Sequence, residues 1–170
     1  MLLEISILSP IIFLFLSIFY FILYPTYLSF FFIIYLSLAG FGLNGLIKYI
    51  LKLLFPHMKL FMRPKGQLYS CSLNPYDFKI NHLLNWGMPS GHMQIATLFA
   101  TIICYYLLFI KNHKTIYDYI VIITLILITL LIGYSRIYLL CHTYLQIFIG
   151  GIIGFILGIF FWRIIKIYNI

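Results

Sequence analysis

The sequence predicts an all-α protein, a polytopic bundle of about five transmembrane helices that forms one integral-membrane domain over residues 1–170. Its composition is the first observation: 64% of the 170 residues are hydrophobic and 8% are charged, whereas a soluble domain carries about 25% charged residues. The second is a mean hydropathy of +1.10. The third is a set of five apolar runs that reach or approach the roughly 20 residues needed to cross a bilayer core. Lipid is therefore expected to surround most of the protein.

The five runs are separated by short breaks except at one place. They cover residues 5–24, 27–47, 93–110, 116–134 and 144–162. Pro25 separates the first two runs, and the polar KNHK segment at 111–114 separates the third and fourth. We expect the first run to be a span rather than a cleaved signal peptide, because its flank carries Glu4 without a basic residue and no A-x-A-like cleavage site follows.

One long polar stretch, residues 55–92, interrupts the apolar pattern and holds four of the six prolines. The second run ends where this loop begins, and the third run starts where it finishes. The turn at 135–146, between the fourth and fifth runs, falls on the same side of the membrane. We therefore expect polar residues of three separate segments to converge at one membrane face. With five spans, the N-terminus shares that face and the C-terminus lies opposite.

The net charge of +8 indicates a membrane flank or an anionic ligand rather than nucleic acid. It comes from 11 Lys and Arg residues against Glu4, Asp77 and Asp118. Proteins that bind nucleic acid gather their basic residues on one solvated face or tail. Here they fall at the ends of apolar runs or in the long loop, so no nucleic-acid partner is expected.

The cysteines and glycines predict packing rather than chemistry. Cys71, Cys104 and Cys141 are an odd number without a CxxC pair, so we expect no disulfide framework and no zinc site. Glycines in the fifth run lie at 150, 151, 154 and 158. Their four-residue spacing would let another helix approach closely, although membrane helices are also generally rich in glycine.

The segment GMPSGHMQ, residues 87–94, is typical of an anion site at a helix start. Ser90 can act as the N-cap of the third apolar helix. Backbone N–H groups in a first helical turn, with the positive end of the helix dipole, bind anions readily. His92 falls in that turn and would face such an anion. The alternative is an ordinary capped helix with a histidine at the membrane interface.

The segment GYSRIYLLCHTYLQ, residues 133–146, places Arg136 and His142 six residues apart between two apolar runs. Arginine keeps its charge and grips phosphate with a fork of N–H donors. A lone basic residue here would be explained by its side chain extending to the lipid headgroups. Two histidines and an arginine at converging helix ends instead favour a functional site. Further candidate cations are Arg63, in MRPKG, and Lys48 and Lys52, one turn apart near the end of the second run.

The distribution of carboxylates narrows the chemistry. None of the three acidic residues lies within these segments, so a carboxylate-bound Mg²⁺ or a two-metal site is not expected. For the same reason Ser90 lacks the acid of a hydrolase triad. The remaining groups suit phosphoryl transfer without a metal or another cofactor, in which cations stabilise the phosphoryl oxygens. One histidine would attack phosphorus and the other would protonate the leaving oxygen.

The motifs RP, PSGH and SR-x5-H together resemble those of the type 2 phosphatidic acid phosphatase (PAP2) superfamily, and within it those of dolichyldiphosphatases. The family's third motif looks like SRVYLLYHTWSQ and its second like GMPSSHSQ, similar to SRIYLLCHTYLQ and GMPSGHMQ here. The resemblance covers roughly residues 40–155. It implies His142 as nucleophile and His92 as general acid. The groups that it implies for phosphate binding are Arg63, Arg136, Ser90 and the Gly91 backbone.

Two positions depart from the wider superfamily. The superfamily pattern has a lysine separated from the RP motif by six residues, and this chain has Pro56 at that position. Lys48, in an N-x-x-x-K pattern with Asn44, or Lys52 would take its place. Gln146 stands where the superfamily places an aspartate that orients the histidine. Glutamine can accept the imidazole N–H but adds no negative charge. It matches the dolichyldiphosphatase motif.

The resemblance implies hydrolysis of polyprenyl or dolichyl diphosphate to the monophosphate and phosphate, in the endoplasmic reticulum membrane with a lumenal site. Basic flanks on the opposite face would then lie in the cytoplasm. Two alternatives stay open. One is a phosphatase for phosphatidate or another lipid phosphate. The other is a non-catalytic membrane protein that binds lipid phosphate, or that assembles through the glycine face at 150–158. The sequence leaves the oligomeric state open.

Overall fold

The computed structural model describes residues 2–64, 71 and 86–168, and within them the protein is all-α, as expected. The helices are α1 (Leu2–Leu23), α2 (Tyr27–Tyr35), the π-helical η1 (Leu36–Gly42), α3 (Leu43–Leu54), the 3-10 helix η2 (Lys59–Phe61), α5 (Gly91–Tyr105), the π-helical η5 (Tyr106–Ile110), α6 (Ile116–Tyr138) and α7 (Tyr144–Tyr168). An isolated antiparallel bridge joins Met62 to Trp86.

Four of the five predicted spans coincide with helices that could cross a membrane, and the first run forms a shorter apolar helix. Four stretches are long and apolar enough to cross a membrane, namely Tyr27–Leu54, Gly91–Ile110, Ile116–Tyr138 and Tyr144–Tyr168, and α1 is apolar from Leu8 to Leu23. The second span continues about two turns beyond its predicted end. Hydrophobicity falls there because Asn44, Lys48 and Lys52 recur at four-residue spacing along one face of α3, while the backbone remains helical.

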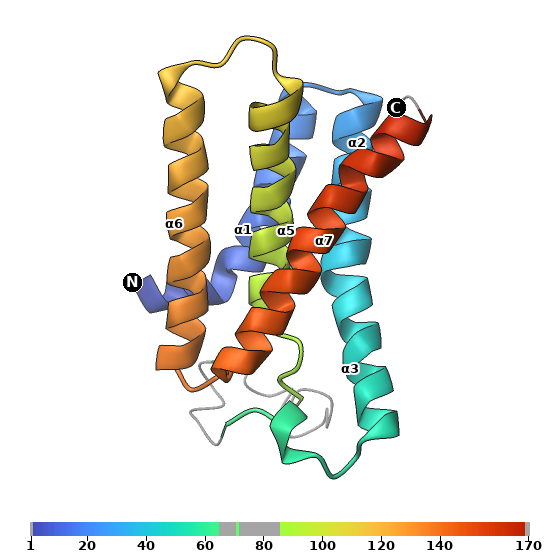
Figure 1. Cartoon of the computed structure of the whole chain (residues 1–170), viewed down its shortest axis with the longest axis vertical. Coiled ribbons are helices and arrows are strands. Elements are labelled where there is room, and N and C mark those ends of the chain that lie inside the picture. Colours follow the sequence, from blue (N-terminus) through green and yellow to red (C-terminus); the bar gives the residue numbers. More distant parts are fainter. Residues whose placement is uncertain (1, 65–70, 72–85, 169–170) are drawn as a thin grey trace.

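Figure 1 shows how the helices place the loops. The end of α3, the start of α5, the end of α6 and the start of α7 all lie at the lower end, which we call the site end. The turn between η5 and α6 and the end of α7 lie at the other end. This is the predicted convergence of three segments, with the C-terminus opposite. Helix α1 begins part-way along the bundle and runs to the far end, where α2 starts.

Helix α5 is central, and its contact with α7 depends on glycine. A Cβ atom on Gly154 would collide with the backbone carbonyl of Gln94, and one on Gly150 with that of Ser90. Gly158 approaches Thr101 equally closely. The close approach predicted from the glycine spacing is therefore confirmed, and it occurs within one chain. Since α5 covers Gly150, Gly154 and Gly158, these glycines serve packing within the chain, and the alternative of assembly with another molecule stays a prediction.

The core lies where α5 meets α7, α1 and η1, and its polar aromatics are satisfied. Phe99 stacks on Phe13, with ring centroids 4.7 Å apart. The Trp162 indole donates to the Ile102 carbonyl at 2.9 Å, and the Tyr35 hydroxyl donates to the Leu157 carbonyl at 2.8 Å. Large apolar side chains such as Ile22, Phe109 and Phe148 remain exposed, as a lipid-facing surface requires.

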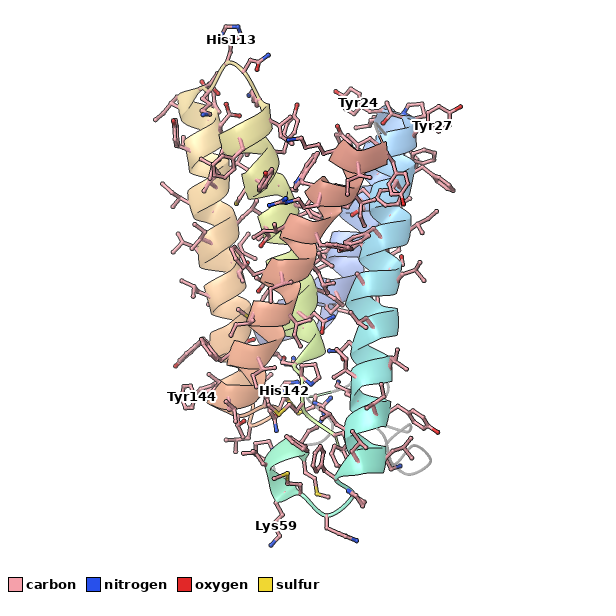
Figure 2. All side chains as sticks on the ribbon, turned by 45° about the vertical axis from the view of Figure 1, so that its right-hand side comes forward. Tyr24, Tyr27, Lys59, His113, His142 and Tyr144 are labelled. Atoms are coloured by element: carbon pink, nitrogen blue, oxygen red, sulfur yellow. A yellow bond between two sulfur atoms is a disulfide. The ribbon has the colours of Figure 1, made fainter. Side chains whose placement is uncertain are left out.

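Exposed tyrosines mark the two ends of the bundle. Tyr24 and Tyr27 lie at the far end and Tyr144 at the site end (Figure 2). Tyr27 is 88% exposed and Tyr144 76% exposed. Tyrosine favours the boundary between hydrocarbon and headgroups, so these positions are typical of two aromatic belts. The belts agree with the membrane orientation of the bundle that the spans predict.

Candidate active site

The turn between α6 and α7 converts the six-residue spacing of Arg136 and His142 into proximity. The Arg136 carbonyl accepts the backbone N–H groups of Cys141 (3.0 Å) and His142 (3.2 Å), and Leu140 N–H donates to the Ile137 carbonyl at 2.8 Å. This closure requires a left-handed residue. Leu140 fills that position with φ 54°, which costs about 1 kcal/mol in a residue with a side chain. Arg136 and His142 both become buried, with 0% and 2% exposure.

The hydrogen bonds of Gln146 fix the tautomer of His142. The Gln146 Nε2 group donates to the backbone carbonyls of Leu60 (3.1 Å) and Met62 (2.8 Å), so the amide oxygen faces the opposite way. That oxygen lies 3.2 Å from His142 Nδ1. Because an amide oxygen can only accept, Nδ1 carries the proton in the neutral ring. The lone pair is then on Nε2, which is buried and has no hydrogen bond to a described residue.

Gln146 also connects the other segments of the site. Its backbone carbonyl accepts the N–H of Ser90 at 3.0 Å. Gly87 lies directly against its side-chain amide, and a Cβ atom there would overlap the Gln146 oxygen. The bonds to Leu60 and Met62 add the segment that leads to Arg63. The glutamine expected only to orient a histidine therefore holds three parts of the chain together.

The segment before α5 is anchored to the loop that carries Arg63. Trp86 pairs with Met62 in the antiparallel bridge, and Gly87 N–H donates to the Phe61 carbonyl at 2.8 Å. Both Trp86 and Met62 precede functional candidates by a few residues. The bridge therefore brings Arg63 beside the start of α5, although more than twenty residues separate them in sequence.

Ser90 occupies the N-cap position of α5, as predicted, but its hydroxyl does not cap the helix. Ser90 Oγ is buried and has no hydrogen bond to a described residue. The expected capping bond is therefore wrong. The Ser90 backbone is held from both sides instead, since its N–H donates to Gln146 and its carbonyl accepts Gln94 N–H at 3.0 Å. The hydroxyl remains available to a ligand.

A buried amide pair, which the sequence reasoning missed, fixes α3 against α5. Asn44 Nδ2 donates to Gln94 Oε1 at 2.8 Å and to the Pro89 carbonyl at 3.3 Å. Gln94 Nε2 donates to the Ala39 carbonyl at 2.7 Å. A Cβ atom on Gly91 would lie 3.0 Å from Asn44 Oδ1, so glycine permits this approach. The sequence does carry a signal for this pair, because Asn44 and Gln94 are amide side chains within apolar runs.

Four basic groups act electrostatically on His142. Burial is the main reason that the pKa of His142 is lowered well below its usual value, and the charges of Arg63, Lys48, His92 and Arg136 lower it further. His142 is therefore neutral near pH 7. Burial also lowers the pKa of Arg63 to about 10, so Arg63 remains charged at neutral pH. The four groups come from α3, the loop before Pro64, the start of α5 and the end of α6.

Of the two candidate lysines, Lys48 is the one that lies at the site. It interacts electrostatically with both Arg63 and His142. Lys52, one turn further along α3, is not among the groups that act on His142. The turn of α3 that carries Asn44 and Lys48 is held against α5 by the amide pair. The last turn, with Lys52, extends beyond that contact.

A disulfide joins Cys71 to Cys141, the residue immediately before His142. The expectation that these cysteines are ordinary packing residues is therefore wrong for two of the three. Cys71 is 4% exposed and Cys141 0% exposed. The two lie 70 residues apart in the sequence, so their spacing gave no signal. Cys104 is free, as expected.

The described part of the site holds no carboxylate. Asp118 lies at the far end, where it accepts from Lys111 at 2.6 Å and 2.8 Å. Asp77 and the Glu4 side chain lie outside the described residues. Within the described part of the chain, no group of three or more His, Cys, Asp or Glu side chains is placed to hold a metal ion. The donors present are cations, hydroxyl and backbone N–H groups, which suit an anion.

Comparison with known proteins agrees with this arrangement. Residues 26–169 match the model of the PAP2 superfamily, a stretch that contains every residue of the site. The chain belongs to the PAP2 superfamily. Within this PAP2 membrane bundle, the motif residues of α5, the α6–α7 turn and the loop before Pro64 meet around His142.

Curated relatives of this PAP2 chain carry the name dolichyldiphosphatase 1. The mouse protein (Mus musculus) is 28% identical over 130 residues, which are 72% of this chain and 48% of the relative. The human protein (Homo sapiens) is 32% identical over 82 residues, 44% of this chain and 34% of the relative. This chain thus spans about half or less of the length of the curated relatives it matches. No solved structure matches it.

Proposed function

We propose that this PAP2 protein is a lipid phosphatase that hydrolyses polyprenyl or dolichyl diphosphate to the monophosphate and phosphate, through a phosphohistidine on His142. The single observation that carries the proposal is the buried, neutral His142, whose Nδ1–H is held by Gln146 and whose Nε2 has no hydrogen bond to a described residue, with the charges of Arg63, Lys48, His92 and Arg136 acting on the ring. A nucleophile fixed in one tautomer beside phosphate-binding groups is what phosphoryl transfer to histidine requires.

In the first step the terminal phosphoryl group would bind among Arg63, Arg136 and Lys48, with the Ser90 hydroxyl and the Gly91 backbone N–H as further donors. His142 Nε2 attacks the terminal phosphorus. A P–N bond forms and the bond to the bridging oxygen breaks. His92, in its protonated form, gives its proton to that oxygen, so polyprenyl monophosphate leaves. Gln146 continues to accept the Nδ1–H while the ring carries the phosphoryl group.

In the second step water would attack the phosphohistidine. His92, now neutral, accepts a proton from the water as the oxygen–phosphorus bond forms. The P–N bond breaks, phosphate leaves, and the electron pair returns to Nε2. The arginines stabilise charge on the equatorial oxygens in both steps, which is the main source of catalysis in phosphoryl transfer.

The same proposal places the protein in the endoplasmic reticulum membrane with its site in the lumen. The Cys71–Cys141 disulfide supports it, because disulfides form and persist in oxidising compartments. The far end carries Lys111, Lys114, Arg163 and Lys166 in short flanks, which favour the cytoplasm. A membrane-impermeant maleimide should label a cysteine placed at His113 only from the cytoplasmic side of intact microsomes.

The test of function is phosphate release by the purified protein from a panel of lipid phosphates in excess EDTA. We expect release from dolichyl diphosphate, slower release from phosphatidate, and insensitivity to EDTA. Abolition by EDTA would contradict the metal-independent mechanism, and a preference for phosphatidate would contradict the substrate. Lipid-phosphate binding without release would favour a catalytically inactive binding protein.

A further inference from the structure

An apolar groove runs along α7 from the helix end that carries the site. Its first part, about 740 Å³, runs on α7 from Tyr144 to Phe155 and is bounded by Met93 of α5. Its second part, about 540 Å³, lies between α5, η5, α6 and α7 and extends to Ile159. Phe155 lines both parts, and Met93 and Thr97 border them one turn apart on α5. We call the two parts together the α7 groove.

One end of the groove is lined by residues that neighbour the site residues in sequence. Tyr144 follows His142 by two residues, and Met93 directly follows His92. From Tyr144 to Ile159 the groove follows about 22 Å of helix, at about 1.5 Å per residue. This is most of the roughly 30 Å of a hydrocarbon core. The groove therefore leads from the phosphate-binding end into the depth of the membrane.

We propose that the α7 groove holds the hydrocarbon tail of the lipid whose diphosphate lies at His142, and that Gly151 sets the space for the first isoprene units. This inference rests on the proposed function and names the tail site of the same substrate. One molecule with an anionic head and an apolar tail fits both adjoining surfaces. The exposed side chains of Phe148 and Phe155 leave the groove open to lipid, so the rest of a long tail can continue into the bilayer.

Gly151 differs from its neighbouring glycines in what it contacts. Gly150 and Gly154 are required by packing, because a Cβ atom on Gly150 would strike the backbone of Ser90, the N-cap of α5, and one on Gly154 would strike the α5 backbone at Gln94. A Cβ atom on Gly151 would only make ordinary contacts, 3.6 Å from Met93 Cε and 3.8 Å from Thr97 Oγ1. Helix packing therefore does not explain glycine at this position. Its missing side chain keeps the floor of the groove open.

The test uses photolabelling of the full chain in lipid nanodiscs, because labelling does not depend on turnover. The probe is a polyprenyl monophosphate with a diazirine part-way along its tail. We expect label on the α7 segment 147–155, competed by unlabelled polyprenyl phosphate. Gly151→Phe should reduce this labelling about tenfold, the loss expected when two buried methylene groups are displaced. Gly151→Ala should reduce it less.

A matched control is Gly42→Phe, since Gly42 is exposed and has nothing within 4 Å of an added Cβ atom. This variant places the same side chain on the lipid-facing surface, away from the groove, and should label like the wild type. Label on α1 or α3, or equal labelling of Gly151→Phe and the wild type, would overturn the inference. So would a Gly151→Phe protein that changes only its oligomeric state, because a second copy would then occupy the groove.

Kinetics separate this inference from the proposed function. We expect Gly151→Phe to raise the KM for long-chain polyprenyl diphosphate about tenfold and to leave kcat/KM for isopentenyl diphosphate, with one isoprene unit, within about twofold. An equal loss for both substrates would contradict a tail site. If the wild type hydrolyses neither substrate but the groove still labels, the proposed function fails while the tail site stands.

Discussion

The two ends of the helix bundle both carry basic side chains but use them differently. At the far end Lys111 is bound to Asp118 at 2.6 Å, and Thr115 completes a capping box with that aspartate, so neighbours in sequence satisfy one another. At the site end the basic groups come from segments far apart in sequence and act together on a buried histidine. A basic residue near a membrane interface that forms an ion pair with a sequence neighbour, such as Lys111 with Asp118, stabilises local structure. Basic residues are candidates for a site when the fold brings several of them to one buried histidine.

The largest effect should come from removing the nucleophile. His142→Ala should lower kcat with dolichyl diphosphate about a thousandfold or more, because no P–N bond can form. The matched control is His113→Ala, in the exposed turn at the far end (Figure 2), which should retain wild-type activity. Phosphate release measures both. Equal activity of the two variants would contradict the proposal that the catalytic histidine lies at the site end.

A second contrast lies within α3. Lys48→Met should lower kcat/KM about a hundredfold, because it removes one cation from the transferred phosphoryl group. Lys52→Met should change kcat/KM by less than about twofold, since Lys52 does not act on His142. Steady-state kinetics of the two purified variants decide the matter. A larger loss from Lys52→Met than from Lys48→Met would contradict the assignment of Lys48 as the first-motif lysine.

The third prediction concerns pH. In Gln146→Glu a carboxylate beside Nδ1 stabilises the imidazolium, so the pKa of His142 rises. Only neutral His142 can attack, and the acidic limb of kcat/KM should therefore move to higher pH. The variant also loses the donations to Leu60 and Met62, so kcat/KM should fall about tenfold even at the optimum. A pH–rate profile identical to the wild type would show that Gln146 does not face His142.

The smallest expected effect on activity comes from the disulfide. Cys71→Ser should lower kcat several-fold by loosening the turn before His142. It should also lower the free energy of unfolding by about 4 kcal/mol, the chain-entropy value for a loop of 70 residues. Cys104→Ser, on α5 away from the site, is the control. Activity assays and thermal unfolding in detergent measure both, and equal behaviour of the two variants would contradict a structural role for the bond.

Much of the fold and half of the site could be predicted because they depend on local sequence. The length of each apolar run predicted a helix, and the order of the loops predicted which ends would meet. His92 and the pair of Arg136 and His142 lie at helix ends, so their separation in sequence translates directly into position. The left-handed turn at Leu140 then brings His142 back toward the end of α6.

The rest of the site depends on contacts between described segments that lie far apart in sequence, and no local pattern encodes them. The distance from the second span to Arg63 could not be read from spacing, because the chain leaves α3 at Leu54 and returns through the bridge of Met62 with Trp86. Sequence spacing could not decide between Lys48 and Lys52 for the same reason, because the answer depends on the path of the chain from α3 to Arg63. The Cys71–Cys141 bond and the unused capping hydroxyl of Ser90 likewise depend on contacts between distant segments.

The most direct test of the central claim is to trap the phosphoenzyme. Dolichyl diphosphate labelled with ³²P in its terminal phosphate would be mixed with the full-length protein and quenched within one turnover. We predict a protein-bound label that survives alkali, is lost in acid and maps to the peptide containing His142. His142→Ala should take up none. Turnover without any protein-bound label, or label on another residue, would contradict the account.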